Sequence, residues 1–381
     1  MVNIGLVGIG QIAEDYISIF AKGSINDGKI CALASRNQDH LDQVINRHHI
    51  EGVSKFTTLE DMLDSGLVDA VIITTPHTLH TEMAEKTLSR GKHVLVDKPL
   101  GIKAGEVDKL AALAGKNPAL QAGVIFNRRS SALYQKVHDL VKSEELGELR
   151  RSLWQITNLY RTYAYYKSGS WRGSFKTEGG GVLMNQAIHQ LDLLLWIAGM
   201  PEKVSARTKE GFHRPVFTEN DVVMVMDYEN GASGQFIASA HECPGTNRLE
   251  LSFDKGQIIV EDDAHLTIRR LDQKEEEFAK HSLLYFDKVP YREEKESFDI
   301  RPNTGEQAAT INNFIDAILG RAKLLCPFEE GRNTVRVVNA AYLSAWRKEE
   351  VALEFHQEAY ELALQSKIEA EEKMKANENL R

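Results

Sequence analysis

The sequence predicts an α/β fold whose first part is a parallel sheet covered by helices on both faces, and three observations support this. A glycine-rich turn follows the apolar strand Asn3–Val7 and opens a helix that runs to about Ala21. Continuously apolar strands then alternate with helices, which is typical of buried parallel sheets. A later apolar strand, His93–Val96, leads directly into Asp97-Lys98-Pro99. Open α/β sheets bind ligands at this end of their strands, so the fold class also indicates where a site should lie.

Length and composition limit the function classes. The chain has 381 residues, 42% hydrophobic and 27% charged, which suits a globular protein of two domains. Its net charge of -9 disfavours nucleic acid and anionic membranes as partners, and no basic patch is evident. Cys31, Cys243 and Cys326 are far apart, so we expect neither disulfides nor a metal site. A start directly in a strand and no apolar run of membrane-spanning length predict a cytoplasmic protein.

The alternation of strands and helices continues through residue 126. The predicted strands are Lys29–Ser35, Val53–Phe56, Ala70–Thr74 and Leu120–Phe126, and the predicted helices are Gln38–His48, Thr58–Asp64 and Leu79–Arg90. Strands of this kind, joined by helical crossovers, form a Rossmann domain.

The turn after the first strand has the GxGxxA pattern of a dinucleotide-binding turn. Gly8 would permit the tight turn, Gly10 would let a pyrophosphate approach the backbone, and Ala13 is small enough for the helix to pack on the strand. The phosphates would meet the helix N-terminus at Gln11 and Ile12. Small residues also make ordinary tight turns, but the place of this turn on the first strand favours NAD or NADP binding.

The second strand ends in Ser35-Arg36-Asn37, where an acidic residue would normally bind the ribose 2′-hydroxyl. An arginine and a hydroxyl suit a 2′-phosphate instead, so NADP is slightly favoured over NAD. The alternative is that Arg36 stacks on adenine or is solvated.

Lys98 lies at the end of the strand His93–Val96. A residue before proline is restricted to extended conformations, so Lys98 should be held at the strand end. A solvated acid–lysine pair in a turn is the simpler alternative. Polar residues after the neighbouring strands favour a site: Thr75-Pro76-His77 and His80 follow the fourth strand, and Asn127 follows the sixth.

A second group of polar residues lies in Val182–Ala198, an apolar segment that follows Gly179-Gly180-Gly181. A helix here would align four residues in one stripe: Asn185, His189, Asp192 and Trp196. Such residues either satisfy each other in a core or line a cavity. The glycines would let a backbone or a ligand come close, and a histidine can exchange protons near neutral pH. Asp192, deeper in the helix, is expected to be structural.

Together these motifs resemble the family of glucose-fructose oxidoreductase and inositol dehydrogenase (Gfo/Idh/MocA). The resemblance rests on GxGxxA, TPxxxH, GKHVLxDKP and FNRR, and on a catalytic segment GGGxxxDxxxHxxD, and it covers Asn3 to about Leu353. The chain departs from the pattern at Asn185, where most dehydrogenases of the family carry Asp, and at His77, where Asn is common. An amide cannot hold a negative charge. Asn185 therefore leaves open a weak dehydrogenase, a subfamily that manages without the carboxylate, or a changed reaction.

The resemblance implies a Rossmann domain over residues 1–126 and a C-terminal α/β domain over residues 127–354. The second domain would have a large, mostly antiparallel sheet, open on one face and often used for oligomerisation. Its predicted strands are Leu149–Tyr160, Lys203–Lys209, Asp221–Tyr228, Ala232–Ser239, Asn247–Phe253, Gly256–Val260 and His265–Arg270, and its predicted helices are Ala132–Ser143, Glu306–Leu319 and Glu329–Arg347.

Residues 355–381 are expected to form a charged helical extension beyond the usual end of the family. Its thin apolar stripe consists of Tyr360, Leu364 and Ile368. We expect this tail to be solvated or packed on a partner.

The resemblance also implies roles for individual residues. The expected catalytic residues are Lys98, His189 and Asn185. The expected cofactor-binding residues are Gly8, Gly10, Gln11, Ile12, Ser35, Arg36, Thr75, Pro76, His77, His80, Asp97, Lys98, Asn127, Trp171 and Arg172. In the aromatic and basic stretch Tyr160–Trp171, the candidate substrate contacts are Tyr163 and Tyr165, together with Asn185 and His189. A packed subunit contact is an equal alternative for this stretch.

The predicted function is an NAD(P)-dependent oxidoreductase that interconverts the alcohol and ketone of a sugar, inositol or related polyol. Lys98 would stabilise the developing alkoxide and His189 would exchange the hydroxyl proton. A glycosidase that retains NAD, or a non-catalytic nucleotide-binding regulator, are the alternatives from other classes. The expected partners are a small-molecule substrate and further copies of the chain in a homodimer or homotetramer, without nucleic acid or membrane.

Overall fold

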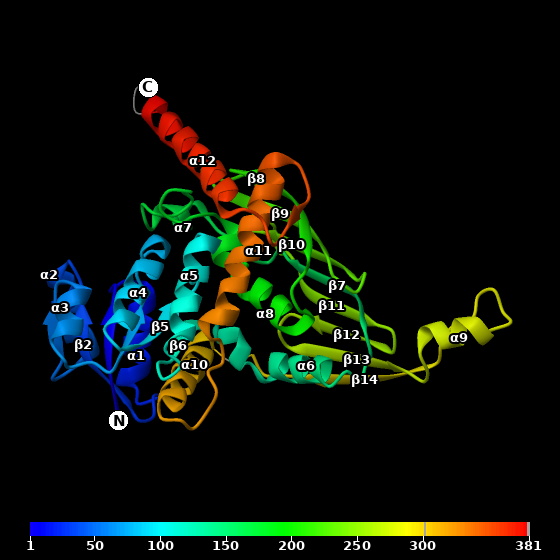
Figure 1. Ribbon diagram of the computed structural model, residues 1–381, viewed down its shortest axis with the longest axis horizontal. Coiled ribbons are helices and arrows are strands. Elements are labelled where there is room, and N and C mark those ends of the chain that lie inside the picture. Colours follow the sequence, from blue (N-terminus) through cyan, green and yellow to red (C-terminus); the bar gives the residue numbers. More distant parts are fainter. Residues whose placement is uncertain (301, 379–381) are drawn as a thin grey trace. The chain divides into compact units, whose positions relative to one another are not determined.

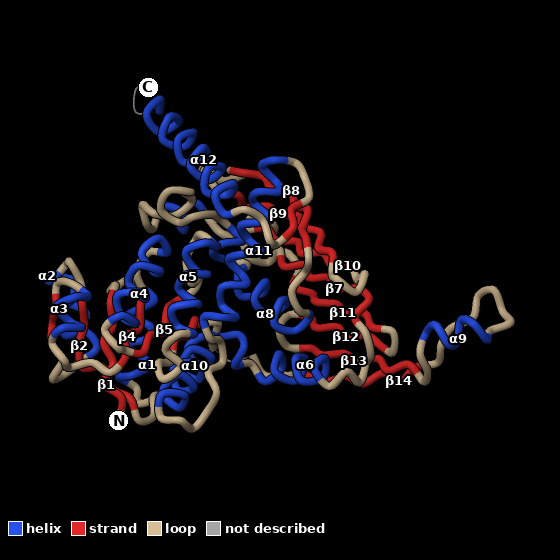
Figure 2. The backbone as a smooth tube through the Cα atoms, viewed as in Figure 1, coloured by secondary structure: helices blue, strands red, loops and turns tan. Residues whose placement is uncertain are grey.

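The structure of the chain, a computed structural model, describes residues 1–300 and 302–378 (Figures 1 and 2). The chain forms two compact units. Unit 1 consists of Met1–Ser130, Thr177–Gly179 and Arg301–Val335, and unit 2 consists of Ser131–Lys176, Gly180–Ile300 and Arg336–Arg381. Within the described residues no helix is both long and apolar enough to cross a membrane.

Unit 1 contains a sheet of six parallel strands, which confirms the predicted Rossmann domain. The strand order is β3-β2-β1-β4-β5-β6. The strands are β1 (Val2–Val7), β2 (Gly28–Ala34), β3 (Ser54–Phe56), β4 (Ala70–Ile73), β5 (His93–Asp97) and β6 (Ala122–Ile125), and the helices between them are α1 (Gln11–Ala21), α2 (Gln38–His48), α3 (Leu59–Asp64), α4 (His80–Ser89) and α5 (Ala104–Gly115). The strand order reverses between β1 and β4, and in such sheets a ligand crevice lies at the carboxyl ends of these strands.

A late helix, α10 (Asn303–Ile318), belongs to unit 1. Ile311, Phe314 and Ile315 are at most 1% exposed, and they join the core cluster formed by β1, α1 and β4. The predicted boundary at residue 126 therefore differs from the units of the structure, because the apolar face of α10 completes the core of the first sheet. The order of elements along the chain does not show that α10 packs on the sheet of unit 1.

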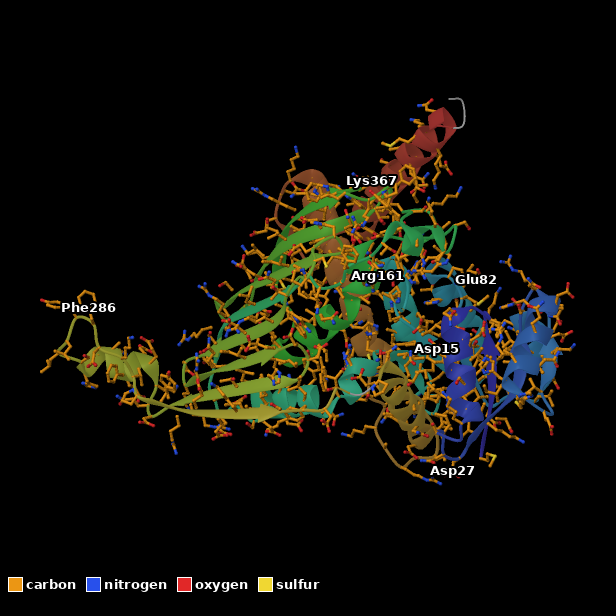
Figure 3. All side chains as sticks on the ribbon, turned by 180° about the vertical axis from the view of Figure 1, so that it is seen from behind. Asp15, Asp27, Glu82, Arg161, Phe286 and Lys367 are labelled. Carbon is orange, nitrogen blue, oxygen red and sulfur yellow. The ribbon has the colours of Figure 1, made fainter. Side chains whose placement is uncertain are left out.

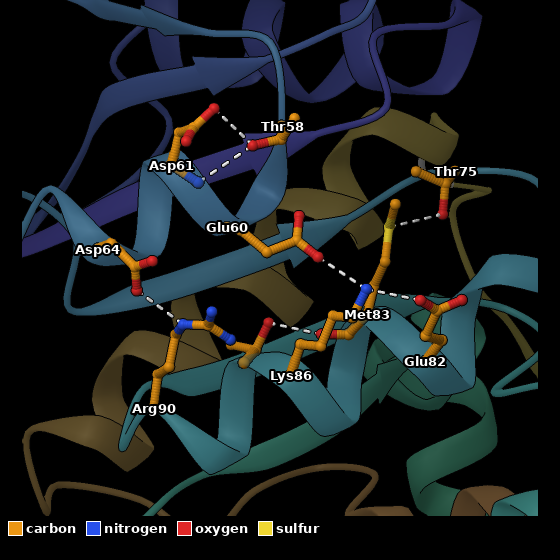
Figure 4. A network of polar contacts seen from close by, with 10 residues as sticks. Thr58, Glu60, Asp61, Asp64, Thr75, Glu82, Met83, Lys86 and Arg90 are labelled. Atoms are coloured by element: carbon orange, nitrogen blue, oxygen red, sulfur yellow. Dashed lines mark hydrogen bonds and ion pairs between the residues drawn. The ribbon is translucent and has the colours of Figure 1, made fainter.

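Helices α3 and α4 are joined by ion pairs on the surface of unit 1 (Figure 4). The Nζ atom of Lys86 lies 2.7 Å from Glu60 and 2.5 Å from Glu82, and Nε of Arg90 lies 2.7 Å from Asp64. Exposed pairs of this kind add little stability. Lys86 and Arg90 are thus each matched by acids on α3 or α4.

Unit 2 contains a sheet of nine strands in the order β14-β13-β12-β11-β7-β10-β9-β8-β15. Only the β7–β10 pair is parallel among the pairings described, so the predicted mostly antiparallel sheet is confirmed. The strands are β7 (Leu149–Ile156), β8 (Lys203–Glu210), β9 (Glu219–Asp227), β10 (Ser233–Ser239), β11 (Asn247–Phe253), β12 (Gly256–Glu261), β13 (His265–Leu271), β14 (Tyr291–Ser297) and β15 (Val351–Ala352). In β9, Val222 and Met224 are fully buried whereas Val223 and Val225 are exposed, which is the alternation of a sheet with one open face.

The helices of unit 2 include two that the sequence did not predict. The two are α7 (Tyr163–Lys167) and α9 (Glu275–His281). The others are α6 (Ala132–Lys142), α8 (Ile188–Ala198), α12 (Gln357–Glu378) and the part of α11 (Phe328–Arg347) from Arg336 on. Helix α9 lies in an arm between β13 and β14 that projects from the sheet, with Phe286 at its tip (Figure 3). The arm and β14 escaped prediction because every residue of β14 is exposed and no apolar alternation marks the strand.

The C-terminal helix α12 packs on its own unit between Tyr360 and Glu371, so the expectation of a solvated or partner-packed tail is wrong for that part, whereas residues 372–377 are exposed. Tyr360 is fully buried and Leu364 is 2% exposed. The ring of Tyr360 stacks on Trp346 of α11 at a centroid distance of 5.9 Å. The apolar stripe is thus part of a core. The last three residues of the predicted extension lie outside the described residues.

A buried carboxylate fixes α12 to the loop that carries the predicted aromatic and basic residues. Glu371 is 2% exposed. One of its oxygens accepts the hydroxyl of Ser174 at 2.5 Å, and the other accepts the backbone N–H of Phe175 at 2.8 Å. Lys375 of the same helix also donates to it. Helix α12 therefore stabilises the loop directly after Trp171-Arg172.

Replacing Glu371 by Gln should lower the free energy of unfolding by about 1.5 to 3 kcal/mol, the range for a hydrogen bond to a charged group. Urea denaturation followed by circular dichroism would measure this. Glu372→Gln is the matched control, because the Glu372 side chain is 50% exposed and pairs only at the surface with Lys176. Equal unfolding midpoints for both variants would contradict the proposed anchoring by Glu371.

Candidate active site

The glycine-rich turn of unit 1 leaves room for a phosphate beside its backbone. Gly8 has φ +90°, and a Cβ atom there would lie 2.7 Å from the backbone nitrogen of Thr75, so the β1–α1 turn packs on the loop after β4. Gly10 precedes α1, and a Cβ atom at this residue would meet no atom within 4 Å. Helix α1 has no side-chain cap, so its first N–H groups are available to an anion. Gln11 is exposed and Ile12 half-buried at this helix start.

The two residues at the end of β2 that were predicted to bind a 2′-phosphate, Ser35 and Arg36, differ in exposure. Ser35 is half-buried, and its hydroxyl accepts the N–H of Asn37 at 3.2 Å. Arg36 is exposed, and it forms no ion pair with any residue in 1–300 or 302–378. Its guanidinium is therefore available to a ligand phosphate.

The loop after β4 is held by two buried histidines. His77 is 6% exposed, and its Nδ1 donates to the carbonyl of Glu178 at 2.9 Å. His80 is 1% exposed, with Nδ1 2.6 Å from the Pro99 carbonyl and Nε2 2.7 Å from the Thr75 carbonyl. Burial lowers the pKa of His80, although the carbonyls and Asp97 act in the opposite direction. His80 therefore joins the loops after β4 and β5 through its two carbonyl contacts.

Residues Thr75 and Pro76 lie between these histidines and the glycine turn. The Thr75 hydroxyl is 3.5 Å from the sulfur of Met83 in α4 (Figure 4). Pro76 directly precedes the 3-10 turn η1 (His77–Leu79). The predicted TPxxxH segment is thus packed against the β1–α1 turn.

Asp97 and Lys98 lie at the end of β5. The hydroxyl of the fully buried Tyr16, on α1, donates to Asp97 at 3.0 Å. Desolvation raises the pKa of Asp97, while the charges of Lys98 and His80 and the Tyr16 bond lower it. Lys98 is half-buried. Asp97 is also half-buried, so both members of the pair are partly accessible, and the Tyr16 bond holds the acid in place.

Asn127, after β6, is 3% exposed and turned towards the protein. Its amide nitrogen donates to Asn303 at 2.8 Å and to Glu306 at 2.9 Å, both on α10. Asn127, a predicted cofactor contact, thus also connects the sixth strand to α10, a role that no local pattern in the sequence indicated.

In unit 2 the predicted single helix Val182–Ala198 is two elements. Val182–Gln186 forms a π-helical turn, and α8 begins at Ile188. The Ala187 N–H donates to the carbonyl of Val182 at 2.7 Å, which is the i to i+5 bond of a π turn. Asn185 therefore lies on the π turn, while His189 lies on α8. Single π turns are frequent at functional sites.

The absence of a side chain at Gly180 and Gly181 lets Tyr342 and Glu219 come close to the backbone before the π turn. A Cβ atom at Gly181 would lie 1.8 Å from the carbonyl oxygen of Glu219, and one at Gly180 would lie 2.1 Å from the hydroxyl of Tyr342. The 1%-exposed Glu219 carboxylate accepts the N–H groups of Gly181 at 2.8 Å and Leu183 at 3.0 Å. Tyr342 donates to it at 2.7 Å. Glu219 thus positions the start of the π turn, and nothing in the sequence identified it, because its partners are far apart along the chain.

Burial raises the pKa of Glu219 from 4.5 to about 7, although its three hydrogen bonds oppose the change. In the folded state Glu219 therefore binds a proton that the unfolded chain releases between about pH 4.5 and 7. Its contribution to stability is complete below that range and is lost as the pH rises through 7.

Glu219→Gln should remove this pH dependence. The difference in unfolding free energy between wild type and variant should change by about 3 kcal/mol across the range, at about 1.36 kcal/mol per pKa unit. Urea denaturation at a series of pH values would measure the difference. Glu210→Gln is the control, because Glu210 pairs with Glu219 in the sheet register but binds Lys367 at the surface. Parallel pH profiles for wild type and Glu219→Gln would contradict the raised pKa.

Three predicted site residues meet at one phenol oxygen of unit 2. The Tyr165 hydroxyl accepts Arg172 at 2.5 Å and the Asn185 amide at 3.4 Å. Gln186 donates to the same oxygen at 3.0 Å. The guanidinium of Arg172 also lies 4.2 Å from the Tyr165 ring centroid and 4.4 Å from that of Trp171. The aromatic loop is therefore packed against the π turn.

The remaining predicted residues of unit 2 differ in burial and in their contacts. His189 is half-buried, and Asp192 is 1% exposed, as expected for a structural acid. Trp196 stacks on His138 of α6 at 3.9 Å, so it belongs to the helix packing. Tyr163 is 56% exposed and is not part of the Tyr165 contacts. No cluster of three or more potential metal ligands is present among the described residues.

Comparisons with known families agree with this arrangement. Residues 2–124 match the model of an oxidoreductase family with an NAD-binding Rossmann fold, and residues 134–259 match the model of the GFO/IDH/MocA C-terminal domain. Together the two matches cover more than half of the chain.

Individual relatives are distant. "Oxidoreductase P35" from Formosa agariphila is 29% identical over 223 residues, which are 57% of this chain and 68% of the relative. A myo-inositol 2-dehydrogenase from Thermotoga maritima is 24% identical over 315 residues, which are 81% of this chain and 90% of the relative. The crystal structure of the WlbA dehydrogenase from Bordetella pertussis with NADH and UDP-GlcNAcA has a TM-score of 0.75 at 22% identity, covering 93% of this chain and 99% of that one.

Proposed function

Because the chain belongs to the GFO/IDH/MocA family of oxidoreductases, we propose that it transfers a hydride between NAD(P) and a carbinol carbon of a sugar, inositol or related polyol. The observation that carries the proposal is the open space beside Gly10, at the uncapped start of α1, in the same unit as Lys98 at the end of β5. The Thermotoga maritima relative is a dehydrogenase of an inositol, and the Bordetella pertussis structure contains NADH, which supports this substrate class and this cofactor.

The residues of unit 1 fit a dinucleotide. Gly10 and the first N–H groups of α1 would hold the pyrophosphate, and Arg36 would bind a 2′-phosphate. When bound, the nicotinamide would supply or accept the hydride. His77 and His80 would keep the loop after β4 in place through their carbonyl bonds.

Lys98 and His189 would have different roles at the reacting hydroxyl group of the substrate. Lys98 would donate a hydrogen bond to the oxygen and stabilise its developing negative charge. His189 would accept the hydroxyl proton during oxidation and return it during reduction. Asn185 would orient the substrate, and its amide already donates to the Tyr165 hydroxyl, so its side chain is held in position.

A screen of sugars and inositols with NAD and with NADP tests the proposal. We expect at least one substrate to change the nicotinamide absorbance at 340 nm with stoichiometric alcohol or ketone formation. Release of free sugar from glycosides without net NADH would identify a glycosidase that retains NAD. Binding of nucleotide without any turnover would indicate a regulator.

The cofactor preference has its own test at Arg36. Arg36→Ala should weaken NADP binding by about 1.5 to 3 kcal/mol, the range for a charge-assisted hydrogen bond, and should change NAD binding much less. Fluorescence titration with each reduced nucleotide would measure both constants. Arg90→Ala is the control, since Arg90 pairs with Asp64 on α3. Equal losses for both nucleotides at Arg36, or a wild type that binds only NAD, would disprove the 2′-phosphate assignment.

A further inference from the structure

The segment formed by β7 and the stretch between β7 and the π turn carries an unusual charge balance. Residues 149–177 contain six cations and no acid, in a chain whose net charge is -9. The six are Arg150, Arg151, Arg161, Lys167, Arg172 and Lys176. The sequence therefore does contain a local basic patch, contrary to the expectation from overall composition.

One of these arginines, Arg161, is bound by a further arginine, Arg214, from the turn after β8. Nε of Arg214 donates to the Arg161 carbonyl at 2.6 Å, and Arg161 donates to the Tyr160 carbonyl at 3.0 Å. The guanidiniums of Arg161 and Arg172 lie 5.1 Å and 4.2 Å from the Tyr165 ring centroid. We call Arg161, Arg172 and Arg214 the arginine cluster (Arg161 is labelled in Figure 3).

No member of the arginine cluster has an acidic partner among the described residues. Their hydrogen-bond acceptors are backbone carbonyls and one phenol oxygen. Nε of Arg172 is shielded from solvent and has no acceptor in the described chain. By contrast, Arg248 and Arg269 on the sheet of the same unit each pair with glutamates.

Three half-buried guanidiniums without a carboxylate are electrostatically unfavourable. An anionic ligand would neutralise them. Guanidinium groups bind carboxylate and phosphate groups through paired hydrogen bonds, and the rings of Tyr160 and Tyr163 beside Arg214, at 5.1 and 5.6 Å, suit a sugar ring. The cluster also adjoins the π turn, because Tyr165 contacts both Arg172 and Asn185.

We infer that the arginine cluster binds a carboxylate or phosphate group of the substrate, so that the polyol on which this protein acts is an anionic sugar. The inference rests on the proposed function for its chemistry, but the anion site rests on the arginine contacts alone. Arg161 and Arg214 would hold the charged group, and the reacting hydroxyl would lie elsewhere on the same sugar.

Matched sugars that differ only at C6 distinguish the two sources of charge. Hexoses, hexuronates and hexose 6-phosphates of gluco, galacto and manno configuration would be compared as substrates with NAD and NADP. We expect kcat/KM for one charged series to exceed that of the neutral hexoses by at least 100-fold, and to fall as salt concentration rises. Equal kcat/KM for charged and neutral sugars would overturn the inference and leave the proposed function standing.

Variants test whether Arg161 and Arg214 cause the preference for charged sugars. Arg161→Gln and Arg214→Gln should each raise KM for the charged sugar 10- to 100-fold, leave kcat within about threefold and leave NADPH affinity unchanged, and Arg161→Lys should recover part of the loss. Arg150→Gln, at an exposed position of β7, should behave as wild type. Equal losses for charged and neutral sugars, or a loss of NADPH affinity, would assign the cluster to folding or to the cofactor.

A binding measurement keeps the inference testable if no sugar is turned over. Calorimetric titration of the cofactor-free protein with inorganic phosphate should show millimolar binding that disappears in the Arg161→Gln/Arg214→Gln double variant. Thermal melting would establish that the double variant is folded, and the two single variants would replace it if it is not. Absence of phosphate binding together with absence of charged-sugar turnover would disprove the site.

Discussion

Lys98→Met should lower kcat by about two to three orders of magnitude, which is the usual loss when one hydrogen-bond donor to a developing oxyanion is removed. Methionine keeps the bulk of the side chain but cannot donate a hydrogen bond or carry charge. Lys98 is half-buried at the end of β5, next to Asp97, whose carboxylate accepts the hydroxyl of Tyr16. Nucleotide affinity and the melting temperature should therefore change little.

Stopped-flow or steady-state turnover with the substrate found in the screen would measure the loss, and nucleotide titration would show that the site is intact. Lys103→Met is the matched control. Lys103 lies five residues further along and pairs with Glu106 of α5 at 2.9 Å, so its replacement removes the same charge at a distance from the strand end. Near wild-type turnover in Lys98→Met would remove this residue from the mechanism.

The parallel sheet of unit 1 could be predicted because its signals are local. Short apolar strands, the glycine turn and the proline after Lys98 are each readable within a few residues. The return of α10 to this unit could not be predicted. Its apolar face, with Ile311 and Phe314, is compatible with either domain, and only packing against α1 and β4 decides the matter.

In unit 2, the prediction of one regular helix over Val182–Ala198 was wrong, because the structure has a π turn followed by α8. A regular helix from Val182 to Ala198 satisfies the apolar pattern, and the π turn depends on contacts from outside it. Glu219 and Tyr342 hold the turn through backbone N–H groups, and the glycines are required because these two residues come so close. Partners separated by 36 to 161 positions leave no signal within the segment.

The C-terminal helix α12 also has a buried contact that its own sequence does not indicate. Its hydrophobic stripe is thin, and the composition of residues 355–378 is that of a solvated helix. Glu371 reverses this interpretation, because a single buried acid bound to Ser174 and Phe175 attaches the helix to the loop of the arginine cluster. A charged residue on a polar helix face gives no indication in the sequence that it will be buried.

His189→Ala should lower kcat by about two to four orders of magnitude, because general acid–base catalysis by a positioned side chain contributes an effect of this size. The variant should also lose the limb of the pH–rate profile that reports titration of the histidine. Turnover measured from pH 5 to 10 with saturating nucleotide would show both effects. His189 is half-buried on α8, and the bonds from Gly181 and Leu183 to Glu219 stay in place in the variant, so we expect it to fold.

Asn185→Asp separates a catalytic role of this segment from a purely structural one. The Tyr165 hydroxyl accepts the Asn185 amide, and with Asp in place it can donate its own hydrogen to the carboxylate while Arg172 and Gln186 still donate to its oxygen. The variant should therefore fold normally and keep or raise kcat, since a carboxylate beside His189 would favour the imidazolium formed when the substrate proton is accepted. A buried stripe without function would behave in the opposite way, because an unpaired charge in a core is strongly destabilising. A large fall in melting temperature for Asn185→Asp, together with near wild-type turnover in His189→Ala, would exclude His189 as the general acid–base residue.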